Sequence, residues 1–151
     1  MSGSSVTKGL LKKIAGTQRF AVLATLTNQQ PYSNLVTFTV SDDLRHIVFA
    51  TNRDTQKYRN ILSNNQVAML IDNRRNSQSD LTEALAITAL GSASELDGDR
   101  SDKLVQSHLN RHPYMAEFLK RRDTAIISII VTDYILARFD GVKRIRVDNT
   151  F

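Results

Sequence analysis

The residues best suited to bind a ligand form a short polar run at positions 51–57, between a predicted strand and a predicted helix. Backbone N–H groups at the start of a helix have no partner within it, and the helix dipole favours an anion there. The run also supplies two cations, Arg53 and Lys57, and the hydroxyl of Thr55. Lys57 falls about one turn into the helix, where its ammonium group can fold back over an anion. The spacing therefore predicts a phosphate site at this junction.

The same residues are also compatible with a junction that binds nothing. Asn52 or Asp54 can serve as the N-cap of the helix, and Lys57 can be a solvated surface lysine. The negative charge of Asp54 weighs against an anion nearby. Spacing alone leaves both interpretations open.

Several other kinds of site are excluded by the sequence. The chain has no cysteine, so disulfides, iron–sulfur clusters, thiol nucleophiles and cysteine-ligated zinc cannot form. No Walker A loop, no G-x-G-x-x-G fingerprint and no G-x-S-x-G elbow occurs. His108 and His112 have the spacing of two ligands on one helix face, but no glutamate follows His108 and no third ligand is evident. We therefore predict surface or capping histidines and no metal site.

The net charge points to an anionic partner. The chain of 151 residues carries a formal charge of +5. Its basic residues fall in short groups, at 74–75, 120–122 and 143–146, which favours a small anionic ligand over nucleic acid or a membrane surface. No apolar run has the length of a membrane span and the start lacks a signal-peptide core, so we expect a cytoplasmic protein.

The elements that position the polar run belong to a mainly β chain. We predict a single domain over residues 1–151, with residues 1–5 disordered. Apolar segments bounded by turn residues predict strands at 19–27, 32–41, 45–51, 66–72, 84–96, 124–132, 134–139 and 142–147. Helical spacing of apolar residues predicts helices at 6–16, after the polar run, and from Asp97-Gly98-Asp99 onward with a break at Pro113.

The connections between these strands indicate their arrangement. Short turns between the first three strands favour an antiparallel meander, Asp140-Gly141 favours a hairpin, and Gly91 indicates a bulge. The predicted fold is an antiparallel barrel of six to eight strands with inserted helices. Most strands are apolar on both faces while few helices are available to cover them, so part of the outer face is expected to pack on a second subunit.

Three segments carry a resemblance to a known family. They read PYSNLVTF at 31–38, IVFATNRDTQKYRNI at 47–61 and VAMLIDNR at 67–74, in that order and with a helix between the third and fourth strands. The sequence resembles the FMN-binding split-barrel family typified by pyridoxamine 5′-phosphate oxidase, over residues 15–140. The resemblance implies a split barrel and a homodimer that binds FMN in clefts at the subunit interface.

The resemblance also assigns residues to the cofactor. It implies that the second strand lines the isoalloxazine ring through Ser33, Asn34, Leu35 and Val36. It implies that the strand-to-helix corner holds the phosphate through Thr51, Asn52, Arg53, Thr55 and Lys57. Asn73 and Arg74 are expected to contact the ring or the phosphate. Leu35 and Val36 suit ordinary barrel core equally well, so their flavin contacts are expected mainly through the backbone.

The sequence says less about the activity of the protein than about its cofactor. The family's type enzyme grips its substrate with an arginine- and histidine-bearing tail, whereas residues 142–151 contain no histidine, so pyridoxamine phosphate oxidation is not expected. We expect an FMN-dependent oxidoreductase acting on an unidentified small molecule, with no catalytic side chain assigned. The alternatives are a non-catalytic flavin- or haem-binding protein and an F420-dependent reductase. A small basic barrel that binds nucleic acid is the least supported interpretation, because the chain has few aromatic residues.

Overall fold

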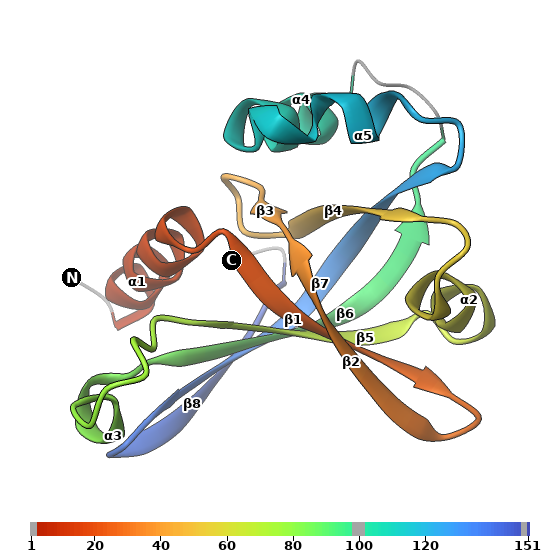
Figure 1. Cartoon of the computed structure of the whole chain (residues 1–151). Helices are drawn as coiled ribbons and strands as arrows, with labels where there is room; N and C mark the ends of the chain where they lie inside the picture. The colour runs from red at the N-terminus through yellow and green to blue at the C-terminus, as the bar shows by residue number, and fades with distance from the viewer. Residues whose placement is uncertain (1–2, 98–101, 149–150) are drawn as a thin grey trace.

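The computed structural model describes residues 3–97, 102–148 and 151 (Figure 1). Its strands form one antiparallel sheet in the order β2-β1-β5-β6-β7-β4-β3, with β8 also paired to β7. The strands are β1 (Phe20–Thr27), β2 (Gln30–Thr37), β3 (Thr39–Val40), β4 (His46–Asn52), β5 (Gln66–Asp72), β6 (Ala86–Glu95), β7 (Thr124–Arg138) and β8 (Gly141–Arg146). The mainly β, antiparallel barrel predicted from the sequence is confirmed.

The sheet curls until its two ends meet at Phe38. The strand order begins with β2 and ends with β3, and only this fully buried residue separates them along the chain. The predicted second strand, 32–41, is therefore divided: its first part pairs with β1 and its last part pairs with β4. The chain turns between β1 and β2 at Asn28 and Gln29, which both have positive φ, as two-residue hairpins require.

Strand β7 is continuous where two strands were predicted. Residues 124–132 and 134–139 were expected as separate strands, but β7 runs unbroken from Thr124 to Arg138. The polar residue at the expected break, Asp133, is 6% exposed because the side chains of Arg144 and Arg146 on β8 compensate its charge. A paired carboxylate can remain in a buried strand, whereas the sequence pattern alone suggests a turn.

The bulge predicted at Gly91 is confirmed, since the register between β6 and β7 shifts between Leu90 and Gly91. The backbones approach closely there, because a Cβ added to Gly91 would lie 2.2 Å from the carbonyl oxygen of Ile130. Only glycine fits this position without movement of the neighbouring strand.

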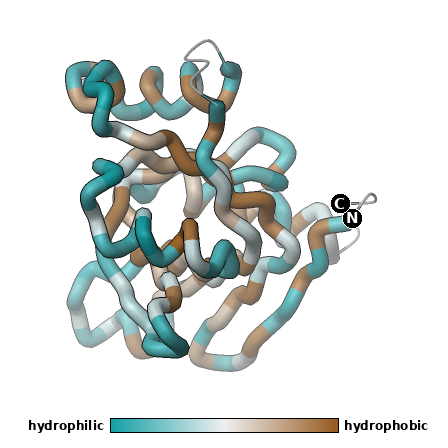
Figure 2. The backbone as a smooth tube through the Cα atoms, turned by 90° about the vertical axis from the view of Figure 1, so that its right-hand side faces the viewer, coloured by the Kyte–Doolittle hydropathy of each residue, from teal (hydrophilic) through white to brown (hydrophobic). Residues whose placement is uncertain are grey.

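Two helices close the ends of the barrel. Helix α1 (Gly3–Thr17) contributes Leu11 and Ile14 to the main core, and α2 (Gln56–Ser63) contributes Ile61. Helix α1 begins at Gly3 and passes through Gly16, so residues 3–5 are helical where disorder was expected, and residues 1–2 lie outside the described residues. In Figure 2 apolar stretches run along the strands of the sheet.

The remaining helices lie outside the barrel. The layer formed by α4 (Lys103–Arg111), η1 (Pro113–Met115) and α5 (Ala116–Lys120) covers β4 and the first half of β7 (Figure 1). The break at Pro113 is confirmed. The predicted start at residues 97–99 lies partly outside the described residues, and the N-cap of α4 is Asp102. A short helix, α3 (Asp80–Glu83), lies between β5 and β6. No helix within the described ranges is long and apolar enough to cross a membrane.

Candidate functional site

The two segments assigned to the cofactor flank the same opening in the barrel. Strand β3 pairs with β4 through Thr39 and Val48. If the same register continued toward β2, Val36 would lie opposite Thr51. At that point, however, β2 has separated from β4 and pairs with β1. The ring segment of β2 and the phosphate corner after β4 therefore lie on the two sides of this split. Ser33, Asn34, Leu35 and Val36 lie on β2, and Thr51, Asn52, Arg53, Thr55 and Lys57 lie at the end of β4 and the start of α2, on either side of the point where β2 and β4 diverge.

The residues of the ring segment alternate between core and surface. Val36 is buried in the barrel, whereas Leu35 is 66% exposed on the outer face and Ser33 is exposed beside it. The core interpretation therefore fits Val36 and not Leu35. The side-chain oxygen of Asn34 is buried and has no hydrogen-bond partner among the described residues. A buried acceptor without a donor is costly, so a ligand that donates a hydrogen bond here would be stabilised.

The phosphate corner begins with a pair of threonines. The hydroxyl oxygens of Thr51 and Thr55 lie 3.1 Å apart, and the Thr55 hydroxyl donates to the carbonyl of Asn52 at 2.8 Å. The N-cap of α2 is Thr55, which accepts from the amide of Tyr58. The prediction of Asn52 or Asp54 as the cap was wrong, because β4 extends through Asn52 and the helix begins only at Gln56.

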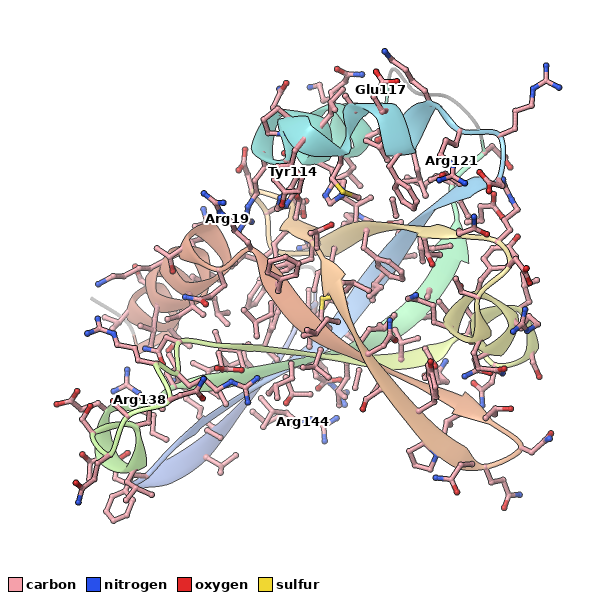
Figure 3. The ribbon with its side chains drawn as sticks, in the orientation of Figure 1. Arg19, Tyr114, Glu117, Arg121, Arg138 and Arg144 are labelled. Atoms are coloured by element: carbon pink, nitrogen blue, oxygen red, sulfur yellow. The ribbon has the colours of Figure 1, made fainter. Side chains whose placement is uncertain are left out.

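Asn52 is held by neighbours in the corner instead. Its side-chain amide donates to Asp123 at 2.6 Å, and its side-chain oxygen accepts from the amide of Asp54 at 2.7 Å. Arg121 also pairs with Asp123, from the turn between α5 and β7 (Figure 3). The loop before α2 is thus attached to the outer helical layer.

Arg53 already has hydrogen-bond partners within the protein. Its guanidinium donates to the Glu95 carboxylate and, at 2.7 Å, to the carbonyl of Arg122. The Tyr58 hydroxyl donates to the other Glu95 oxygen at 2.6 Å. Glu95 raises the pKa of Arg53 and also that of Tyr58 through these hydrogen bonds. The charge of Arg53 is therefore compensated before any ligand arrives.

Lys57 differs from Arg53 in this respect. It lies in the first turn of α2, is half-buried, and has no ion pair among the described residues. Burial lowers its pKa, because the charged ammonium loses contact with water. A bound anion would relieve that cost. Lys57 and the first amides of α2 therefore form the part of the corner that is available to a phosphate.

Asn73 and Arg74 lie away from this corner. The backbone amide of Asn73 donates to the Leu85 carbonyl, and its side-chain oxygen accepts from the Leu85 amide, which extends the pairing of β5 with β6. Arg74 pairs with Asp72 at the end of β5. That end lies near Phe20, at the opposite end of β1 from the α2 contact between Asn60 and Thr25.

The two helical histidines are structural. His108 and His112 are buried, so the prediction of surface positions was wrong, although His112 is the C-cap of α4. His108 Nδ1 lies 2.8 Å from the Thr39 hydroxyl, and His112 Nε2 lies 2.8 Å from the carbonyl oxygen of Phe38. Burial lowers the pKa of both, to about 4 for His108. No cluster of three metal-ligating side chains occurs among the described residues.

Comparison with known proteins identifies the family. The family profile for pyridoxamine 5′-phosphate oxidase matches residues 8–134, so the chain belongs to the pyridoxamine 5′-phosphate oxidase family of split barrels. No curated protein sequence matches the chain.

Solved structures share the fold at low identity. A Clostridium acetobutylicum protein related to general stress protein 26, of the pyridoxinephosphate oxidase family, is 14% identical with a TM-score of 0.75. The match covers 97% of this chain and 98% of that protein. A haem-binding protein from Mycobacterium smegmatis is 18% identical with a TM-score of 0.78, over 89% of this chain and 55% of its own. An FAD-binding protein from Mesorhizobium loti is 16% identical with a TM-score of 0.65, over 89% and 92%.

Proposed function

We propose that this protein is an FMN-binding flavoprotein and an FMN-dependent oxidoreductase that acts on a small molecule in the cytoplasm. The observation that carries the proposal is Lys57, a half-buried cation without an ion pair among the described residues, in the first turn of α2. Membership of a family named for a flavin-dependent oxidase supports it, as does the FAD-binding neighbour.

The corner would hold the FMN phosphate by direct donation. In this proposal the Lys57 ammonium and the first amides of α2 donate to the phosphate oxygens, and the Thr51 and Thr55 hydroxyls would join them by turning away from the Asn52 carbonyl and from each other. Asn52 and Arg53 shape the loop through Asp123 and Glu95, and contact the phosphate at its rim.

The ring would lie along β2. Leu35 offers an apolar surface on the outer face, and the polar contacts of β2 with the ring would be mainly through its backbone. Bound FMN would supply the electron transfer itself, while the protein orients the ring and excludes water. No side chain of the described residues is assigned as a proton donor or acceptor.

We further propose a homodimer with the cofactor at its interface. A row of outward residues, Leu35, Val22, Leu70, Thr88 and Ile135, crosses five neighbouring strands. Helices α1 and α2 pack into the barrel ends and the α4–α5 layer covers β4, so this apolar row is only partly covered in one chain, with Leu35 exposed and the other four residues half-buried. A second copy would bury it and complete the cleft beside β2.

Two other cofactors are alternatives. Haem is suggested by the haem-binding neighbour, but two of the three histidines are buried and hydrogen-bonded, and His46 lies at the opposite end of β4 from the phosphate corner. F420 is a deazaflavin that carries a phosphate and would use the same corner.

The experiment that tests the proposal compares FMN with riboflavin, which lacks the phosphate. Titration of the apoprotein, followed by flavin fluorescence, should give at least about tenfold tighter binding of FMN, since one charge-assisted contact contributes that much. Equal affinities would refute the phosphate site. Binding of haem or F420 with no binding of either flavin would replace FMN by that cofactor.

A further inference from the structure

Two hollows on the surface meet at one arginine. One, of about 180 Å³, lies on the outer sheet face against Phe20 and Leu35, where we place the flavin ring. The other, of about 460 Å³, lies between α1 and the loop after β5. Gln18 and Arg74 line both, so they stand at the passage from the ring site to the larger cavity.

Asp72 fixes the position of Arg74. One oxygen of its carboxylate accepts from the Arg74 backbone amide at 3.0 Å and lies 3.2 Å from the Arg74 Nε. Asp72 itself is held in the last pair of the ladder between β5 and β6. The Arg74 side chain is 55% exposed, and its two terminal nitrogens have no hydrogen-bond partner among the described residues.

A guanidinium held through Nε presents its terminal nitrogens as a fork, which matches the paired oxygens of a carboxylate or a phosphate. Further into the cavity, Lys13 and Arg75 add positive charge. The nearby carboxylate of Asp80 accepts from the backbone amides of Arg75 and Ser77, which partly compensates its negative charge.

We infer that Arg74, positioned by Asp72, recognises an oxyanion group on the substrate at the edge of the flavin site. The inference rests on the proposed function for the position of the ring. It assigns to Arg74 the selection of carboxylate- or phosphate-bearing substrates, rather than a contact with the FMN phosphate, which lies at the α2 corner.

The test uses benzoate and inorganic phosphate as probes of the apoprotein, followed by NMR of the ¹⁵N-labelled chain. One of the probes should shift the amide and Nε signals of Arg74 saturably, and the probe that does so identifies the oxyanion. Arg74→Gln should weaken that binding at least tenfold. Lys120→Gln is the control, because Lys120 is 74% exposed, also pairs with a carboxylate and lines neither hollow, and it should leave the binding of the probes unchanged.

A second measurement separates this inference from the proposed function. FMN affinity of Arg74→Gln should stay within about threefold of the wild type, because Arg74 is remote from the phosphate corner. A tenfold loss of FMN affinity, or no saturable shift with either probe, would overturn the role of Arg74. If the wild type binds no FMN at all, the proposed function fails, whereas the NMR titration still decides whether Arg74 binds an oxyanion.

Discussion

Arg53 donates through its guanidinium to the carboxylate of Glu95, which joins the loop before α2 to the end of β6. The pair is supported by Tyr58, whose hydroxyl donates to the second oxygen of the carboxylate. The two cations of the polar run therefore have different partners. Arg53 contributes to the shape of the corner, whereas Lys57 is left for a ligand.

Replacing these two cations should have different effects on FMN binding. Lys57→Ala is expected to weaken FMN binding about ten- to a hundredfold, because one charge-assisted hydrogen bond is lost. Arg53→Ala should weaken it less than about tenfold and lower the free energy of unfolding only slightly, as expected for an ion pair exposed to water. Fluorescence titration and urea unfolding measure the two quantities.

The control for this pair is Lys120→Ala, which removes an exposed lysine on α5 and should leave both quantities unchanged. A larger loss of FMN affinity in Arg53→Ala than in Lys57→Ala would contradict the assignment.

Gly91 and Gly9 should respond in opposite directions to the same substitution. Gly91→Ala places a Cβ against the backbone of Ile130 and is expected to lower the free energy of unfolding by about 2 kcal/mol or more. Gly9→Ala, inside α1 with no atom within 4 Å of the new Cβ, should raise it by about 0.5–1 kcal/mol. Urea unfolding of both variants checks the prediction, and a stable Gly91→Ala variant would show that β6 and β7 can separate.

Acid should destabilise the fold through His108. Its pKa is lowered from 6.5 to about 4, mainly by burial, with the neighbouring His112 and Arg111 acting in the same direction. Between these pH values the unfolded chain binds a proton that the folded chain excludes, so stability falls as pH falls through this window. The loss attributable to His108 is about 3 kcal/mol at its lower end.

The variant His108→Gln isolates this contribution. As the pH falls from 6.5 to 4, the free energy of unfolding of this variant should decrease less steeply than that of the wild type. Urea unfolding at a series of pH values measures both curves. Arg19, just after α1, and Tyr114, after α4, lie near His112 and are unchanged in the variant (Figure 3). Parallel curves for the two proteins would show that His108 does not cause the acid sensitivity.

The proposed dimer depends on the outer face around Leu35. Leu35→Asp should convert the dimer to a monomer in sedimentation velocity, because a charge replaces an exposed leucine in the apolar row. Leu62→Asp is the matched control, since Leu62 on α2 is 67% exposed against 66% for Leu35, and it should leave the assembly intact. A dimeric Leu35→Asp variant would show that the interface lies elsewhere. A monomeric wild type would exclude the proposed dimer.

The sequence predicted most strands because their apolar residues alternate or run continuously. Strand β5 matches its predicted bounds, and the bulge at Gly91 was visible as a glycine inside an apolar strand. The errors arose where a distant residue decides the local structure. Asp133 stays in β7 because Arg144 and Arg146 of β8 compensate its charge. His108 is buried because the Thr39 hydroxyl forms a hydrogen bond with its Nδ1 atom.

The candidate site, like the fold, was predicted where local sequence or the family resemblance determines it. The strand-to-helix corner followed from local sequence, and its position opposite β2 followed from the family resemblance. The pairing of Arg53 with Glu95 joins the loop before α2 to the end of β6, and no spacing rule connects these two residues. The role of each site residue toward a cofactor stays a prediction.

The decisive measurement is the absorbance spectrum of the purified protein, before and after incubation with FMN and gel filtration. After filtration the protein fraction should show the visible bands of oxidised flavin, at one FMN per chain. A colourless protein that does not retain added FMN would contradict the claim that the opening between β2 and β4 is an FMN site.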